Sequence, residues 1–279
     1  MTRVFTCVTI VALSAGIARA GSHDFVIEHA GVGGTSQQAA PYIQKFLEHI
    51  EGALGWPKGS ANGDFFPEPD ADFKKFLADK KPGIGLIDPD QFLELQKLEG
   101  LSIIGTVFGK NQSLGHLNLV TTDAAIKGPA DLKGKIIAST HLQEPKFLTR
   151  IVFDGKFDAK DFTLQKTVSM LKAVKAVSGG KADAALLSDE EVEWLKSPSS
   201  PYPTVKVVWT SPALPPMPVV AFNKNSTPAE RDAFAKMLLG MCSDPKGAEV
   251  CKALDIQKFG PPDKTAYDAA MKKYSKIAK

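Results

Sequence analysis

Polar residues follow four short apolar runs of the chain, at points where buried strands are expected to end. In open α/β sheets, ligands bind beyond the carboxyl ends of the strands, so these positions are candidates for a binding site. In chain order they are Gly34, Thr35 and Ser36; Asp88; Thr140, His141 and Gln143; and Ser188 and Asp189. We expect them to converge on one cleft, which is the argument for treating them together.

Each of these positions also has a local structural explanation. The turn that ends in Gly34, Thr35 and Ser36 opens a helical pattern, so its N–H groups and hydroxyls could hold an anion or simply cap the helix. Asp88 precedes a proline and could be an N-cap. The segment from Thr140 onward could be a capping loop. Ser188 and Glu191 have the S-x-x-E spacing of a capping box, which leaves the Asp189 side chain free.

Signatures of catalysis are missing from the sequence. It contains no Gly-x-Ser-x-Gly, His-Glu-x-x-His or Walker loop. Gly31 and Gly33 open a dinucleotide-like pattern, but Ser36 stands where the third glycine belongs. The five histidines show no pair at metal-ligand spacing. We therefore expect a protein that is not an enzyme and holds no cofactor.

The composition further narrows the classes of protein to which the chain could belong. The chain has 279 residues, of which 43% are hydrophobic and 23% charged, which is typical of a globular protein. The formal net charge is only +3, so there is no basic footprint for nucleic acid. The length suggests two domains or one large one.

Residues 1–20 are predicted to be a secretory signal peptide. Arg3 precedes an apolar run from Val4 to Ala18, and Ala20 ends a small-residue cleavage pattern. The run is too short to span a bilayer, so we expect an exported protein that is not embedded in the membrane. Cleavage near Ala20 lowers the net charge to +1, because Arg3 and Arg19 leave.

The number and placement of the cysteines are consistent with export. Cys7 lies in the signal peptide, and Cys242 and Cys251 remain as a pair that predicts a disulfide. A loop of about ten residues closed in this way stabilises by roughly 2.7 kcal/mol in the chain-entropy model.

A metal role is a separate hypothesis. Cleavage after Ala20 would leave His23 in third place, where a free terminal amine and the imidazole can bind Cu(II) or Ni(II). His141, Met170 and Met217 could add a soft site in the cleft. The alternative is that His23 stands there by chance and that the methionines fill the core.

The elements that must position these residues alternate between strands and helices. Strands separated by helices predict parallel βαβ units, in two runs of roughly 24–110 and 130–190. Two lone strands, 117–121 and 219–222, are expected to cross between the resulting lobes. We assign residues 21–115 plus 216–279 to lobe 1 and residues 116–215 to lobe 2, so lobe 1 is discontinuous.

Four segments resemble type II periplasmic solute-binding proteins of ABC transporters, in the phosphate/phosphonate-binding branch. They are 128–138, 176–185, 211–220 and 254–259. The resemblance implies a two-lobe Venus-flytrap fold with two crossing hinge strands. It also implies a monomer that binds a small solute and delivers it to an ABC permease in the inner membrane. A periplasmic sensor or an accessory protein for a redox enzyme is the alternative with the same fold.

Departures from that branch bear on the solute. Relatives that bind phosphonate usually have several Ser or Thr residues where this chain has only Thr140. Phe92 stands where relatives often have Tyr, and Met170 stands where they often have His. Glu144 would repel a dianion if it faced the cleft. The sequence therefore predicts that the ligand is not simple phosphate or phosphonate, and that acidic residues favour a cationic, zwitterionic or metal-bearing solute.

Overall fold

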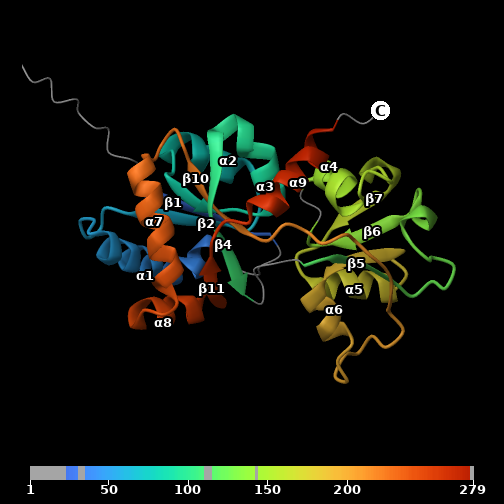
Figure 1. Cartoon of the computed structure of the whole chain (residues 1–279). Coiled ribbons are helices and arrows are strands. Elements are labelled where there is room, and N and C mark those ends of the chain that lie inside the picture. The colour runs from blue at the N-terminus through green and yellow to red at the C-terminus, as the bar shows by residue number, and fades with distance from the viewer. Residues whose placement is uncertain (1–22, 31–34, 110–114, 142–143, 277–279) are drawn as a thin grey trace, which may run out of the picture.

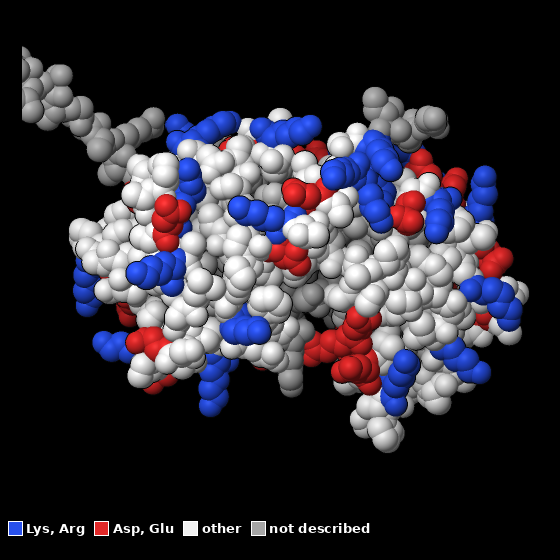
Figure 2. All heavy atoms as spheres, viewed as in Figure 1, with Lys and Arg blue, Asp and Glu red and all other residues white. Residues whose placement is uncertain are grey.

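A computed structural model describes residues 23–30, 35–109, 115–141 and 144–276 of the chain. The predicted signal peptide, Gly34 and Gln143 lie outside the described residues. Within these ranges the chain forms two β-sheets, each with its own helices, which lie side by side as two lobes (Figure 1). Figure 2 shows acidic and basic side chains interspersed over both lobes on the face that it views.

The first lobe is built on a six-stranded sheet in the order β11-β4-β10-β3-β1-β2. Its core strands β2, β1 and β3 are parallel, whereas β10 and β11 run antiparallel to β4. The strands are β1 (Asp24–Glu28), β2 (Asn62–Phe66), β3 (Ile84–Leu86), β4 (Leu101–Gly109), β10 (Pro218–Phe222) and β11 (Ile256–Gly260).

Helices cover this sheet. They are α1 (Ser36–Leu54), α2 (Ala71–Lys80), α3 (Pro89–Leu95), α7 (Pro228–Met241), α8 (Pro245–Ala253) and α9 (Lys264–Ser275), and a π-helical turn (Gln96–Gly100) extends α3. Apolar residues of α1 recur at helical spacing on one face, and Ile43, Phe46 and Ile50 of that face lie in the core. A capping box formed by Thr227 and Glu230 begins α7, with Pro228 at its first position.

The second lobe is built on a five-stranded sheet in the order β7-β6-β8-β5-β9. Strands β7, β6 and β8 are parallel, and β5 is antiparallel to β8 and β9. The strands are β5 (Leu117–Thr121), β6 (Ile136–Ser139), β7 (Thr163–Lys166), β8 (Ala184–Ser188) and β9 (Lys206–Thr210). The helices are α4 (Pro145–Phe147), α5 (Met170–Ser178) and α6 (Asp189–Leu195), with a π-turn (Leu148–Val152) and 3₁₀ turns (Pro129–Leu132, Ala159–Asp161).

Two connections carry the chain between the sheets. Strands 117–121 and 219–222 form as predicted, and the chain changes sheet just before each of them. The connections run antiparallel side by side, because Leu214 N–H donates to Gly115 O at 2.8 Å and Ser211 N–H donates to Leu117 O at 2.9 Å. Paired backbone hydrogen bonds of this kind fit a two-stranded hinge.

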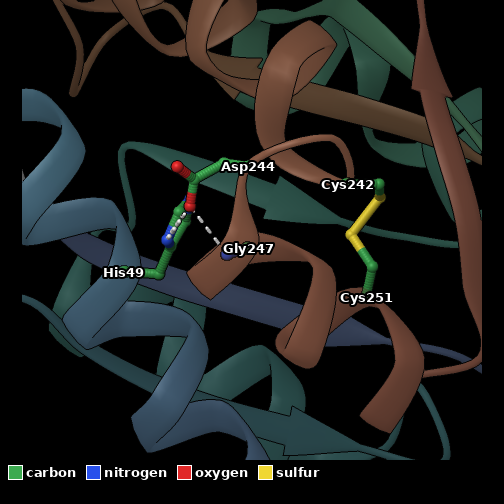
Figure 3. The surroundings of a disulfide bond; sticks show 5 residues. All are labelled: His49, Cys242, Asp244, Gly247 and Cys251. Atoms are coloured by element: carbon green, nitrogen blue, oxygen red, sulfur yellow. Dashed lines mark hydrogen bonds and ion pairs between the residues drawn. A yellow bond between two sulfur atoms is a disulfide. The ribbon is translucent and has the colours of Figure 1, made fainter.

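The predicted disulfide is present. Cys242 ends α7 and Cys251 lies in α8, so the bond ties two consecutive helices together (Figure 3). In the turn between them, the Asp244 carboxylate accepts from Lys246 N at 3.0 Å and Gly247 N at 2.9 Å, and so caps α8. No described helix has the length and apolarity that a membrane crossing requires.

Candidate functional site

The carboxyl ends of the parallel strands in the two lobes face each other across the junction. Glu68, which follows β2 of the first lobe, forms an ion pair of 2.7 Å with Lys166, the last residue of β7 in the second. The other parallel strands end at the same two edges. Residues at the ends of β1, β3, β6 and β8 therefore lie where a ligand between the lobes would meet both sheets.

Three buried carboxyl groups gather on the first-lobe edge. Glu28 ends β1, Asp88 follows β3, and Asp90 lies in the first turn of α3; their exposed fractions are 0%, 9% and 8%. The Asp88 carboxylate accepts from Ala30 N at 2.7 Å and lies 2.6 Å from His29 Nδ1. Asp88 N–H in turn donates to Glu28 Oε2 at 3.1 Å. We call Glu28, Asp88 and Asp90 the acidic cluster.

The electrostatics of the acidic cluster are dominated by burial. Burial raises the pKa of Glu28 well above its ordinary value, and the neighbouring Asp88 and Asp90 add to the effect. Burial, with the charge of Asp88, also raises the pKa of Asp90 to about 7. Glu28 Oε1 has no hydrogen-bond partner among the described residues. The positive charge of Lys166, in the second lobe, lowers the pKa of Glu28 and so partly compensates the negative charge of the acidic cluster.

The second-lobe edge brings together three of the residues singled out by the sequence. Thr140 is buried directly after β6, and Ser188 ends the neighbouring parallel strand β8. His141 Nε2 lies 3.1 Å from Glu191 Oε2, and the same oxygen accepts from Ser188 N at 2.8 Å. Ser188 is therefore the N-cap of α6, and the predicted capping box also positions His141.

The expectation that Asp189 is free is wrong. Its carboxylate accepts from Asn118 Nδ2 at 2.7 Å and from His116 N at 3.1 Å, and it lies 2.9 Å from His116 Nδ1. Partial burial acts to raise its pKa, but the hydrogen bonds from His116 and Asn118 outweigh it and hold the pKa below the ordinary value. Asp189 also packs on Gly115, where any Cβ would clash with it. Asp189 therefore fixes the start of β5 beside the hinge.

Other residues of the predicted site take structural positions. Thr35 is the N-cap of α1, in a capping box with Gln38, and the Ser36 hydroxyl donates to Phe65 O. The Phe92 ring is buried and packs edge-on against Tyr267, with ring centroids 4.9 Å apart. Met170 begins α5 and packs partly buried against the core of the second lobe.

Two side chains named in the metal and ligand hypotheses are bound within the protein. The His23 ring stacks on Trp56 with centroids 3.9 Å apart, and its Nδ1 lies 3.2 Å from Ser60 Oγ. The described part of the chain contains no group of three or more His, Cys, Asp or Glu side chains placed to hold a metal ion.

Glu144 caps α4 by accepting from Lys146 N at 3.0 Å and from Phe147 N at 2.6 Å.

Sequence reasoning missed Glu28 and Asp90. The signal for Glu28 was a carboxyl group directly after the apolar residues Phe25, Val26 and Ile27, at the expected strand end. The signal for Asp90 was its position two residues after Asp88, in the first turn of the next helix. The proximity of Glu28 to Asp88 became evident only from the parallel pairing of β1 with β3.

Two α/β lobes joined by two antiparallel connections define the type II periplasmic-binding-protein class. Solved structures support this assignment. The Xanthomonas citri protein XAC2383 bound to ATP matches with a TM-score of 0.67 at 16% identity, over 91% of this chain and 97% of that one. A binding-protein component of a Pseudomonas aeruginosa ABC phosphonate transporter matches with a TM-score of 0.62 at 17% identity, over 91% and 88%.

The Prochlorococcus marinus protein PhnD1, in complex with methylphosphonate, has a TM-score of 0.61 at 13% identity, over 91% of this chain and 99% of that one. No curated protein matches the chain in sequence. The family model described as "ABC transporter, phosphonate, periplasmic substrate-binding protein" matches residues 34–267. The chain belongs to this family of periplasmic substrate-binding components.

Proposed function

We propose that the protein binds a small polar solute between its two lobes and delivers it to an ABC permease in the inner membrane. Lobe 1 comprises residues 21–115 plus 216–279, lobe 2 comprises residues 116–215, and residues 1–20 are removed on export to the periplasm. The observation that carries the proposal is the facing pair of sheet edges, joined by the Glu68–Lys166 ion pair. Family membership supports the transport role.

The solute, in this proposal, carries a positively charged group and is not simple phosphate or phosphonate. The acidic cluster supports this reading, because buried carboxyl groups repel an anion and favour a cation that replaces their lost hydration. Asp88, which the sequence already indicated, forms the cluster with Glu28 and Asp90. Thr140 and His141 of the second lobe face the remainder of the solute.

Hinge bending connects binding to transport. A solute that contacts both lobes binds the closed form better than the open form, and it can shift the equilibrium only by that difference in affinity. The antiparallel pairing at Gly115 and Leu214 holds together the two connections about which the lobes would bend. The permease would then distinguish the closed, loaded form from the open form.

A thermal-shift comparison tests the proposal. Putrescine, arginine and glycine betaine are compared with phosphate and methylphosphonate, each over a range of concentrations. A solute at 100 times its Kd stabilises by about 2.7 kcal/mol, which for a chain of this size is a rise in Tm of roughly 5–10 °C. We expect a cationic compound to give this shift and phosphate to give none.

Matched variants assign the shift to the acidic cluster. Asp90→Asn should weaken the response to the cationic compound at least tenfold in concentration. Asp232→Asn, on the exposed face of α7, serves as the control and should leave the response unchanged. A strong response to phosphate, or an equal response in both variants, would refute the assignment of ligand class.

A further inference from the structure

Helix α9 belongs to neither lobe alone. It begins on the first lobe, where Asp263 N–H donates to Thr106 Oγ1 at 3.2 Å. Tyr267, one turn into the helix, donates its hydroxyl to Pro216 O at 2.6 Å in the connection between the sheets. The C-terminal half of α9 packs against the Leu148–Val152 turn of the second lobe, beside α4 (Figure 1). The helix therefore adds a further link across the junction, besides the two chain connections and the Glu68–Lys166 ion pair.

Tyr274 forms the centre of this link. Its hydroxyl oxygen lies 2.6 Å from Glu94 Oε2 on α3 of the first lobe and 2.9 Å from Glu144 Oε2 at the start of α4 in the second. The residue is only 3% exposed. One hydroxyl thus serves a carboxylate from each lobe.

Basic side chains of the second lobe surround the same tyrosine. Lys146 Nζ lies 3.9 Å from the centroid of the Tyr274 ring and 3.6 Å from Glu94 Oε2. The Arg150 guanidinium donates to the Tyr274 carbonyl oxygen. Lys273, the preceding residue, lies 2.6 Å from Asp154 Oδ1. These contacts bind the end of α9 to the second lobe while its beginning stays on the first.

The proton of the Tyr274 hydroxyl reduces the repulsion between the two carboxylates, one of which belongs to each lobe. Burial raises the pKa of Tyr274, and its hydrogen bond with Glu94 raises it further, so the hydroxyl stays protonated. Its single proton can therefore be shared between the Glu94 and Glu144 carboxylates, which would otherwise present like charges to each other across the junction. Separation of the lobes breaks this bridge, because Glu94 and Glu144 belong to different lobes.

We propose that the C-terminal half of α9 is a clasp that holds the two lobes together, with the Tyr274 hydroxyl between Glu94 and Glu144 as its lock. The clasp acts in the solute-free protein and sets how often the lobes open. Glu144 also caps α4, so the Tyr274 hydroxyl contacts a residue that stands three positions after His141 in the sequence. The proposal rests on the proposed function in one respect, since it requires two lobes that can separate.

Distance measurements on the solute-free protein test the clasp. Spin labels are attached through unnatural amino acids at the exposed positions Lys45, on α1, and Lys175, on α5, and double electron–electron resonance gives the distance distribution between the lobes. Tyr274→Phe keeps the ring and removes only the hydroxyl. We expect the ratio of long to short distances to rise about tenfold, the effect of losing one hydrogen bond to a charged group.

Two further variants separate the lock from general packing. Tyr42→Phe removes a hydroxyl from an exposed tyrosine and should leave the distribution unchanged. Adding Glu94→Gln to Tyr274→Phe should restore much of the short-distance population, because the amide can donate to Glu144. The clasp is refuted if Tyr274→Phe leaves the distances as in the wild type, or if Glu94→Gln restores nothing.

The test of the clasp does not depend on finding the solute. If Tyr274→Phe separates the lobes but no compound raises Tm, the clasp stands and the proposed function fails. If a compound raises Tm but Tyr274→Phe leaves the distances unchanged, the proposed function stands and the clasp fails.

Discussion

At the scale of single residues, helix capping does not explain the burial of the acidic cluster. Asp88 occupies the N-cap position of α3, yet its side chain makes no cap hydrogen bond and instead accepts from Ala30 N. Glu28 is fully buried, and one of its oxygens lacks a partner among the described residues. A buried carboxyl group of this kind costs stability unless a proton or a cation compensates its charge. Buried carboxyl groups with raised pKa values are typical of functional sites.

Asp90→Asn should stabilise the solute-free protein, and more so at high pH. The pKa of Asp90 is raised to about 7 from an ordinary value of 3.8, mainly by burial. Between these values the folded state binds more protons than the unfolded state, so the contribution of Asp90 to stability is lost as pH rises toward 7. Asparagine does not titrate. The gain in unfolding free energy should therefore be roughly 1–3 kcal/mol larger at pH 8 than at pH 5.

Urea unfolding of the wild type and of Asp90→Asn at both pH values measures this difference. Asp232→Asn again serves as the control, because its side chain is exposed on α7. A gain from Asp90→Asn that is equal at pH 5 and pH 8 would show that Asp90 does not titrate between them, and the explanation by burial would be wrong.

The candidate site was predictable in part, for reasons that differ between residues. Asp88, Thr140 and Ser188 were found because each follows an apolar run at a strand end, which is a local signal. The engagement of Asp189 by His116 and Asn118 could not be found in this way. It depends on the antiparallel pairing of β5 with β8, between residues about 70 positions apart in the chain.

At the scale of elements, local signals were reliable where a cap or a proline fixed the start of a helix. The predicted capping box of Ser188 and Glu191 begins α6, a second capping box begins α7, and Pro145 opens α4. Strand β2 was not predicted. Its residues, Asn62–Phe66, include no β-branched side chain, and the segment becomes a strand by pairing with β1. A strand that forms through tertiary pairing in this way cannot be recognised from the β-propensity of its own residues.

Gly247 in α8 has no room for a larger side chain. A Cβ there would clash with the backbone carbonyl of Met241, at the end of α7, and would lie 3.0 Å from His49 Cε1 on α1. Figure 3 shows Gly247 and His49 on either side of Asp244, close to the disulfide. Because the disulfide limits how far α8 can move away from α7, Gly247→Ala should destabilise by about 1–3 kcal/mol.

Gly240→Ala gives the matched comparison. Gly240 lies in α7, and a Cβ added there would meet open space, so alanine should stabilise the helix by about 0.5–1 kcal/mol. Thermal unfolding of both variants under identical conditions measures the contrast. Two shifts of the same sign would contradict the close approach of α7 and α8 at Gly247.

At the scale of the whole molecule, one hydrophobic cluster extends across both lobes. It contains Phe92 and Phe222 from the first lobe and Phe147 and Ile151 from the second, with Tyr267, Ala270 and Tyr274 of α9 between them. The sequence predicted that the C-terminal helices return to the first lobe, and α9 does begin there. Its contact with the second lobe depends on side chains more than 100 residues apart, which no local pattern indicates.

This shared cluster predicts that the two lobes unfold together. Differential scanning calorimetry of the solute-free protein should give one transition, because α9 couples the cores of both lobes. Ala270→Glu places a charge in the buried seam beneath α9 and should uncouple them, so that the transition broadens or splits. Ala269→Glu, one residue away on the exposed face of the same helix, changes the charge equally and should leave a single transition. If both variants unfold as the wild type does, α9 does not join the two cores, and cooperation between the lobes must come from their other links, which are the two chain connections and contacts such as the Glu68–Lys166 ion pair.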